Sequence, residues 1–396
     1  MKFDLPSTNQ LREIGDELGF EMDDQYVADV LSFMEPFAES FNTVESMPDS
    51  LPEVKYPRGD WHRPEGEENK HGAWYVKSTI KGADTGILAG KTIAIKDSAC
   101  VAEIPMMNGA SVLEGYVPDI DATVVTRVLD AGGTITGKAV CEYFCLSGGS
   151  STSASSVVHS PRNPGFTPGG SSTGSAALVA AGEVDMALGG DQAGSVRIPA
   201  SFSGVVGLKP TFGLVPYTGI MGIETTIDHA GPISADVADN ALFLEAIAGE
   251  DQLDSRQRVP RVDSYTDALN QPVDGLRIAV IREGFGRHDS HPDVDATVRA
   301  AAAHYSQLGA EVEEVSIPMH EMGLAIWGAI CVDGMYNVMF RGHGFGQNTA
   351  GVYPTSLVDL MAAAGARSEE FPDTFRFGLL LGRYSNKAYG SHFYAK

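Results

Sequence analysis

The chain has 396 residues, of which 43% are hydrophobic and 20% are charged. At about 150 residues per domain this length allows two or three domains, and the apolar content is enough for a folded core. Acidic residues number 52 and basic residues 28, so the net charge is −24. A surface of this sign repels nucleic acid and anionic lipid, so neither a nucleic acid nor a membrane is expected as a partner.

The first residues lack the apolar segment of a secretory signal, and no run of 18 apolar residues predicts a membrane span. The four cysteines are Cys100, Cys141, Cys145 and Cys331, and they form neither a CxxC pair nor an even framework. Cys141 and Cys145 are spaced to share a helix face, but no cluster of His or Cys accompanies them, so no metal and no other cofactor is expected. Reduced thiols and a cytoplasmic location are the simplest interpretation.

The N-terminal part predicts helices followed by a linker. Apolar residues recur at helical spacing up to Gly19, and a second helix with a broad apolar stripe follows, which Pro36 is expected to kink. Residues 46–72 are rich in proline, glycine and charge, which is typical of a linker. We therefore expect an N-terminal helical block with its linker at 1–72, packed against the main domain or against a second copy in a homodimer.

From residue 73 onward, short apolar strands alternate with amphipathic helices. Asp121 is the expected N-cap of the first of these helices. The expected strands are 91–97, 133–140, 184–190, 276–283 and 310–318, and the expected helices are 122–132, 175–182 and 292–309. This alternation predicts an α/β layered fold with a mostly parallel sheet.

Glycine and serine are concentrated between residues 167 and 216. Two Gly/Ser-rich loops in this region are separated by one helix and one strand, which places both loops at the same edge of the sheet. The loop GDQAGS (190–195) follows the carboxyl end of a strand, where open α/β sheets bind their ligands. The sequence therefore predicts a functional site at these two loops.

Three segments, GGSSTGS (169–175), GGDQAGSVRIPA (189–200) and GVVGLKPTFGLVP (204–216), together resemble the amidase signature family of serine hydrolases. KTIAIKD (91–97) resembles the lysine-bearing strand of that family, and DQAGS, LVPYTGI and TIDHAGP resemble its bacterial nitrile-pathway amidases. The resemblance implies an α/β/α layered fold with a mixed, mostly parallel central sheet over residues 73–396. Because family members continue further, we expect the catalytic domain to be truncated at residue 396.

The resemblance also implies a catalytic triad of Lys96, Ser171 and Ser195, with a cis peptide bond before Ser171. These residue types suit the chemistry, because a serine hydroxyl is a weak nucleophile until a neighbouring base takes its proton. A lysine is a base only when neutral, and burial on the apolar strand before Lys96 favours that form. The implied activity is hydrolysis of a small-molecule amide to the acid and ammonia through an acyl-enzyme on Ser195, with Lys96 and cis-Ser171 relaying protons.

The turn formed by Gln192, Ala193, Gly194 and Ser195 is the expected oxyanion hole, since such a hole needs backbone N–H donors. Two residues of the region depart from the family pattern: Thr173 and Ala193 stand where glycines are usual. If position 193 needs a positive φ, alanine there would be unfavourable by about 1 kcal/mol. The charged pair on either side of the turn, Asp191 and Arg197, is expected to be a scaffold ion pair.

Other interpretations use the same residues differently. GSSTG (170–174) matches GxSxG and would make Ser172 the nucleophile, but no strand precedes it. A Ser-His-Asp triad would need a positioned histidine, for which His159 and His229 are the candidates. Within the family, the alternative is the glutamine-hydrolysing subunit of a tRNA-dependent amidotransferase; the N-terminal helical block and the DQAGS variant favour a stand-alone amidase. A non-catalytic binding protein with an amidase fold is a further alternative.

Overall fold

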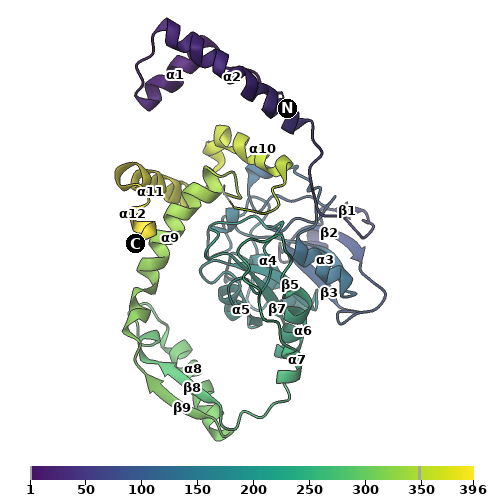
Figure 1. Cartoon of the computed structure of the whole chain (residues 1–396). Coiled ribbons are helices and arrows are strands. Elements are labelled where there is room, and N and C mark those ends of the chain that lie inside the picture. Colours follow the sequence, from purple (N-terminus) through teal and green to yellow (C-terminus); the bar gives the residue numbers. More distant parts are fainter. Residues whose placement is uncertain (1, 347–348) are drawn as a thin grey trace. The chain divides into compact units, whose positions relative to one another are not determined.

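The computed structural model of the chain describes residues 2–346 and 349–396 (Figure 1). Its contacts separate two compact units, Met1–Leu51 and Pro52–Lys396. Residues 52–72, which the sequence suggested as part of the linker of the N-terminal block, belong to the larger unit. The boundary between the N-terminal unit and the larger unit therefore lies after Leu51, earlier than the expected boundary after residue 72.

The N-terminal unit contains two helices, α1 (Thr8–Leu18) and α2 (Asp24–Glu45). Ser7 and Gln10 form a capping box at the start of α1, and Gly19 ends this helix in the left-handed conformation. The second helix continues through Pro36 as one element. The predicted packing of this block against the main domain or a second copy stays a prediction.

The larger unit is built on a mixed sheet of seven strands in the described residues. Across the sheet their order is β1 (Trp61–His62), β2 (Trp74–Lys81), β4 (Thr134–Ala139), β3 (Thr92–Lys96), β5 (Met186–Asp191), β7 (His229–Ser234) and β6 (Val206–Gly207). Only β3 pairs in parallel, with β4 on one side and β5 on the other; the other four pairings are antiparallel. The expected mixed sheet is confirmed, but only its centre is parallel. The sequence analysis expected a mostly parallel sheet because it did not predict the antiparallel strands β2 and β7.

Helices flank this sheet in two groups, as expected for an α/β/α layered fold. Helix α3 (Thr123–Asp130) contacts α6 (Val237–Ile247), α4 (Thr173–Ala181) contacts α5 (Arg197–Ser203), and both groups contact strands of the sheet. Ala122, not Asp121, occupies the N-cap of α3. The expected cap was wrong because Asp121 instead forms a buried ion pair with Arg58 and accepts a hydrogen bond from the Ala102 N–H.

The last third of the chain begins with the short helix α7 (Tyr265–Ala268). It continues with the expected strand–helix–strand unit, in which β8 (Arg277–Ile281) and β9 (Glu311–Val315) pair in parallel around α8 (Pro292–Gln307). The final helices are α9 (Gly323–Gly334), α10 (Thr355–Ala364), α11 (Asp373–Tyr389) and α12 (His392–Ala395). The helical stretch Pro318–Phe340, which includes α9, is by length and composition apolar enough to cross a membrane. Core helices of soluble proteins meet the same criterion, so the absence of a membrane partner stays a prediction.

The topology brings the two predicted loops to one edge of the sheet. Because β3 and β5 are parallel and adjacent, their carboxyl ends lie at the same edge, where Lys96 ends β3 and Asp191 ends β5. Every residue of β5 is buried. The loop after β5 and the N-terminus of α4 therefore meet beside Lys96.

Candidate active site

Lys96 and Ser171 are in direct contact. The Lys96 side chain is buried at the end of β3, and its Nζ donates hydrogen bonds to Ser171 Oγ at 2.8 Å and to the Gly190 carbonyl at 3.3 Å. The peptide bond between Gly170 and Ser171 is cis, as expected. The structure thus brings together two of the three residues in the implied triad.

Ser195 lies on the adjoining loop and is 7% exposed. Its carbonyl accepts a hydrogen bond from the Ser172 N–H at 3.2 Å, and the Ser172 hydroxyl bridges the N–H and C=O of Gly190. Ser172 therefore ties the two loops together. Over residues 2–346 and 349–396, Ser195 Oγ makes no hydrogen bond, so the hydroxyls of Ser171 and Ser195 are not bonded to each other, whereas Ser171 Oγ accepts from Lys96.

The turn that carries Ser195 is closed by an ion pair. Arg197 donates to both carboxylate oxygens of Asp191, at 2.9 and 3.0 Å, and the Val196 N–H donates to the same group at 3.2 Å. Burial opposes ionisation of Asp191, but Arg197 and the backbone donors outweigh it and lower the pKa of this carboxyl. The expected scaffold ion pair is confirmed.

The backbone N–H groups of residues 192–195 have no hydrogen-bond acceptor within the part of the chain that the structure describes. The Gln192 side chain donates to the Tyr217 hydroxyl at 3.0 Å, and the Gln192 carbonyl accepts from Trp327 Nε1 at 3.0 Å. Gly194 has φ +143°, whereas Ala193 is not among the described residues with positive φ. The condition under which alanine at position 193 would be unfavourable is therefore not met, because the positive φ lies one residue later, at Gly194.

The second departure from the family pattern, Thr173, is also accommodated. Its hydroxyl donates to Glu142 Oε1 at 3.1 Å, and the other oxygen of this buried carboxylate accepts from the backbone and hydroxyl of Thr152. Thr173 thus connects the start of α4 to the loop after β4.

Sequence reasoning missed the position of one cysteine. Cys141 and Cys145 do not share a helix face: Tyr143–Cys145 is a single turn in which Phe144 and Cys145 both have positive φ. This turn directs both thiols to Asn108 Oδ1, at 3.3 and 3.4 Å, and brings Cys145 beside Lys96 and Ser171. No local sequence signal predicts such a turn, because neither residue is glycine.

The family follows from the comparison with known proteins. The family model described as Amidase matches residues 61–396, which is most of the chain. The chain belongs to the amidase family.

Several relatives share this membership. The chain is 44% identical over 344 residues to an enantioselective amidase of Rhodococcus rhodochrous, and 40% identical over 316 residues to a glutamyl-tRNA(Gln) amidotransferase subunit of Synechococcus sp. (strain RCC307). These alignments cover 86% and 79% of the chain, but only 66% and 64% of the relatives. The chain thus spans just under two thirds of their lengths.

Solved structures agree with this assignment. The corresponding glutamyl-tRNA(Gln) amidotransferase subunit from Thermotoga maritima matches with a TM-score of 0.66 at 31% identity, covering 81% of this chain and 67% of that one. A peptide amidase from Stenotrophomonas maltophilia matches with a TM-score of 0.65 at 29% identity, covering 78% and 64%.

A cavity of about 360 Å³ opens beside the Ser195 turn. It is lined by Asp191, Gln192, Ala193, Arg197, Lys209, Phe212, Thr226, Ile227, His229, Leu324 and Trp327. His229, a candidate base in the alternative triad, holds its Nδ1 at 2.8 Å from the Ile227 carbonyl and lines this cavity. Within the described residues, His159 makes one hydrogen bond, from its backbone N–H to the His71 carbonyl. Among the described residues, no three His, Cys, Asp or Glu side chains are grouped to hold a metal ion.

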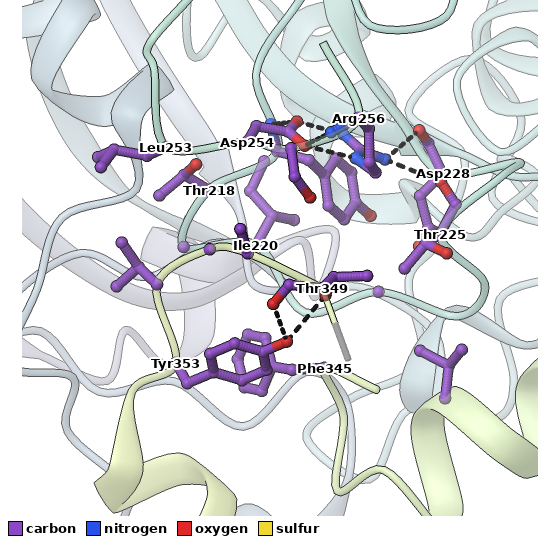
Figure 2. Close-up of a pocket in the computed structure, with 18 of the residues that line it drawn as sticks. Thr218, Ile220, Thr225, Asp228, Leu253, Asp254, Arg256, Phe345, Thr349 and Tyr353 are labelled. Atoms are coloured by element: carbon purple, nitrogen blue, oxygen red, sulfur yellow. Dashed lines mark hydrogen bonds and ion pairs between the residues drawn. The ribbon is translucent and has the colours of Figure 1, made fainter. Parts of the chain in front are cut away.

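A second cavity, shown in Figure 2, contains an unusual carboxyl group. Asp228 is 2% exposed and lies near Arg256, which donates to the Asp228 carbonyl at 3.0 Å and pairs with Asp254. Burial raises the pKa of Asp228 from 3.8 to about 7, although the Ile223 N–H and Arg256 oppose the shift. The folded protein therefore holds this proton at a pH where the unfolded chain has released it.

We expect this proton to make stability depend on pH. The protonated Asp228 carboxyl contributes at most about 4 kcal/mol to the free energy of unfolding. This contribution is complete below about pH 4 and is lost as the pH rises to about 7. Asp228→Asn keeps the shape but cannot ionise, so its urea-unfolding free energy should fall less between about pH 5 and pH 8 than that of the wild type. An equal fall in both proteins would contradict the raised pKa.

Proposed function

We propose that this protein hydrolyses a carboxylic acid amide to the free acid and ammonia, through a covalent acyl-enzyme on Ser195. The observation that carries the proposal is the buried contact between Lys96 Nζ and Ser171 Oγ at 2.8 Å, on a loop that is hydrogen-bonded to the Ser195 loop. An amine held on a hydroxyl, next to a second unpartnered hydroxyl, is the arrangement that activates a serine nucleophile without histidine.

The proposed reaction moves one proton along the three residues. Ser195 Oγ attacks the amide carbon and passes its proton to Ser171, while Ser171 passes its own to the neutral Lys96 amine. The oxyanion is stabilised by backbone N–H groups of the 192–195 turn, which have no acceptor elsewhere in the described chain. When the C–N bond breaks, Ser171 returns a proton to the departing ammonia and is reprotonated by Lys96. Water then attacks the acyl-enzyme by the same route.

The cavity beside the Ser195 turn supports an amide with an apolar acyl group. Phe212, Ile227, Leu324 and Trp327 supply apolar side chains to its lining, and the hydrogen bond from Trp327 to the Gln192 carbonyl fixes its position beside the turn. An apolar wall favours an apolar substrate, because a charged group placed against it loses its hydration.

The second candidate function is glutamine hydrolysis as one component of an amidotransferase. The observation that favours it is the 40% identity to a glutamyl-tRNA(Gln) amidotransferase subunit. Glutamine carries both an ammonium and a carboxylate, and Lys209 is a charged residue of the same lining that could meet the carboxylate, whereas Asp191 and Arg197 already pair with each other. The third alternative, a non-catalytic binding protein, predicts no turnover at all.

Ammonia release from a panel of aliphatic amides, aromatic amides and glutamine tests these functions. The expected result is turnover of at least one apolar amide, with labelling of Ser195 by a fluorophosphonate. Turnover of glutamine alone would favour the amidotransferase function. If the protein shows no turnover of any amide and no labelling of Ser195, the proposal that it is catalytic is contradicted.

Replacing Ser171 by alanine removes the hydroxyl between Lys96 and Ser195. We expect amide hydrolysis to fall by about 10²- to 10⁴-fold, the usual effect of losing a general acid–base group. The loss should be smaller than for Ser195→Ala, because Lys96 can still act through a water molecule. Steady-state ammonia release measures it, and activity within about threefold of the wild type would contradict the relay.

The cellular setting is also a proposal. We propose a cytoplasmic protein, because all four cysteines are free and buried, as in a reducing compartment. We further propose a homodimer joined through the apolar stripe of the N-terminal helices. Sedimentation of the full chain and of a version starting at residue 52 would test the dimer; equal oligomeric states would contradict it.

A further inference from the structure

The peptide unit between Ser171 and Ser172 joins the two loops of the candidate site. Its carbonyl, on Ser171, accepts hydrogen bonds from the Glu142 N–H at 3.2 Å and from the Thr173 hydroxyl at 3.3 Å. Its N–H, on Ser172, donates to the Ser195 carbonyl at 3.2 Å. Because a peptide unit is planar, a rotation that moves the carbonyl also moves the N–H. The hydrogen bonds on the carbonyl therefore affect the hydrogen bond to the Ser195 loop.

The Thr173 hydroxyl is itself held by a buried carboxyl group. It is shared between the Ser171 carbonyl and Glu142 Oε1, the latter at 3.1 Å. The other oxygen of Glu142 accepts from the N–H and the hydroxyl of Thr152, at 2.9 and 2.6 Å. Thr173 and Glu142 are both fully buried, so bulk water does not compete for these hydrogen bonds. The donor of Thr173 thus has a fixed direction toward Ser171.

Ser171 is also held through its side chain, because its Oγ accepts the hydrogen bond from Lys96 Nζ at 2.8 Å. The Thr173 hydroxyl adds a contact to the backbone of the same residue. Glycine, the residue usual in the family at position 173, has no hydroxyl and would leave the Ser171 carbonyl with the Glu142 N–H as donor. The departure from the family pattern therefore adds a hydrogen-bond donor at the point where the two loops meet.

We propose that Thr173 is a positioning residue, whose hydroxyl fixes the peptide unit between Ser171 and Ser172 and so aligns Ser171 with the Ser195 loop. The inference rests on the proposed roles of Ser171 and Ser195 in amide hydrolysis. Thr173 is not among the described residues that line the cavity beside the Ser195 turn. Its hydroxyl therefore affects the rate at which bound substrate reacts and not the binding of substrate.

The first test compares Thr173→Val, which keeps the shape of threonine but has no donor, with Thr173→Ser, which keeps the hydroxyl. The measurements are steady-state amide hydrolysis and the rate of Ser195 labelling by a fluorophosphonate. Both kcat and the labelling rate should fall about five- to tenfold in the valine variant, the factor expected from one lost hydrogen bond, and stay within about twofold in the serine variant. KM should change less than about twofold in either variant. If the valine variant does not fold, Thr173→Gly removes the same hydroxyl.

Ser175→Ala is the matched control. Ser175 lies two positions later in α4, is equally buried, and donates its hydroxyl to the Leu188 carbonyl at 2.8 Å. Losing this hydrogen bond should lower the melting temperature, as the loss of the Thr173 hydroxyl does, but leave kcat and the labelling rate within about twofold of the wild type. Wild-type rates in Thr173→Val would overturn the proposal. So would an equal loss of rate in Ser175→Ala, since any buried hydroxyl of α4 would then have the same effect.

A second measurement does not depend on catalysis. Backbone hydrogen exchange, followed by mass spectrometry on fragments that contain residues 169–175, reports on the Ser172 N–H. Exchange in these fragments should be about five- to tenfold faster in Thr173→Val than in the wild type, because the peptide unit opens more often, and unchanged in Thr173→Ser. Equal exchange in the wild type and the valine variant would overturn the proposal. If the wild type shows neither labelling nor amide turnover, the proposed function fails, and the exchange rate alone decides whether Thr173 holds the peptide unit.

Discussion

Replacing Ser195 by alanine is expected to abolish amide hydrolysis, with a fall in kcat on the order of 10⁶-fold, as for other serine hydrolases that lose the nucleophile. The reason is the geometry of the turn: Ser195 follows Gly194, its hydroxyl has no hydrogen-bond partner in the described residues, and free N–H groups precede it. No acyl-enzyme can form without that oxygen. Ammonia release and fluorophosphonate labelling should therefore disappear together.

The control for this experiment is Ser201→Ala, which makes the same change on an exposed position of the neighbouring helix α5. It should keep full activity, and both variants should melt at the wild-type temperature. The assignment of the nucleophile fails if Ser195→Ala retains turnover near that of Ser201→Ala. It also fails if the label is found on Ser172, the nucleophile of the alternative motif.

The centre of the sheet could be predicted because its residues carry the information locally. Strands β3, β4 and β5 are short apolar runs, and the intervening helices end at glycines, so their parallel order follows from the alternation. The outer strands were missed for the opposite reason. β7 (His229–Ser234) contains glycine and proline, which reduce the strand signal, and its antiparallel pairing with β5 depends on a return of the chain that no local pattern encodes.

The candidate site was predicted to a similar extent. The motifs predicted that Lys96 and Ser171 lie together, because both belong to segments with fixed spacing, and the structure has the contact between them; their catalytic roles stay a prediction. Cys145 could not be predicted, since its place beside Lys96 depends on a turn with positive φ at two non-glycine residues. The question left open for Ala193 could not be answered from the sequence either, because the sequence does not reveal which of two adjacent residues takes the positive φ.

Replacing Lys96 by methionine or arginine is expected to reduce amide hydrolysis by at least about 10³-fold, near the upper range for a general base. Methionine keeps most of the buried volume of the side chain but has no amine. Arginine keeps the positive charge but does not lose its proton in proteins, so it cannot accept one from Ser171. If both variants are inactive, the site needs a base at this position and not merely a charge or a packed side chain.

The pH dependence gives the second part of this prediction. Methionine removes the proposed proton acceptor, so a rise of the wild-type rate with pH that comes from this acceptor should be absent from the residual rate of Lys96→Met. Single-turnover measurements with a chromogenic anilide would make the chemical step visible. An arginine variant with activity close to the wild type, or a rise of the same size in Lys96→Met, would show that another group takes the proton from Ser171, whose hydroxyl accepts its 2.8 Å hydrogen bond from Lys96.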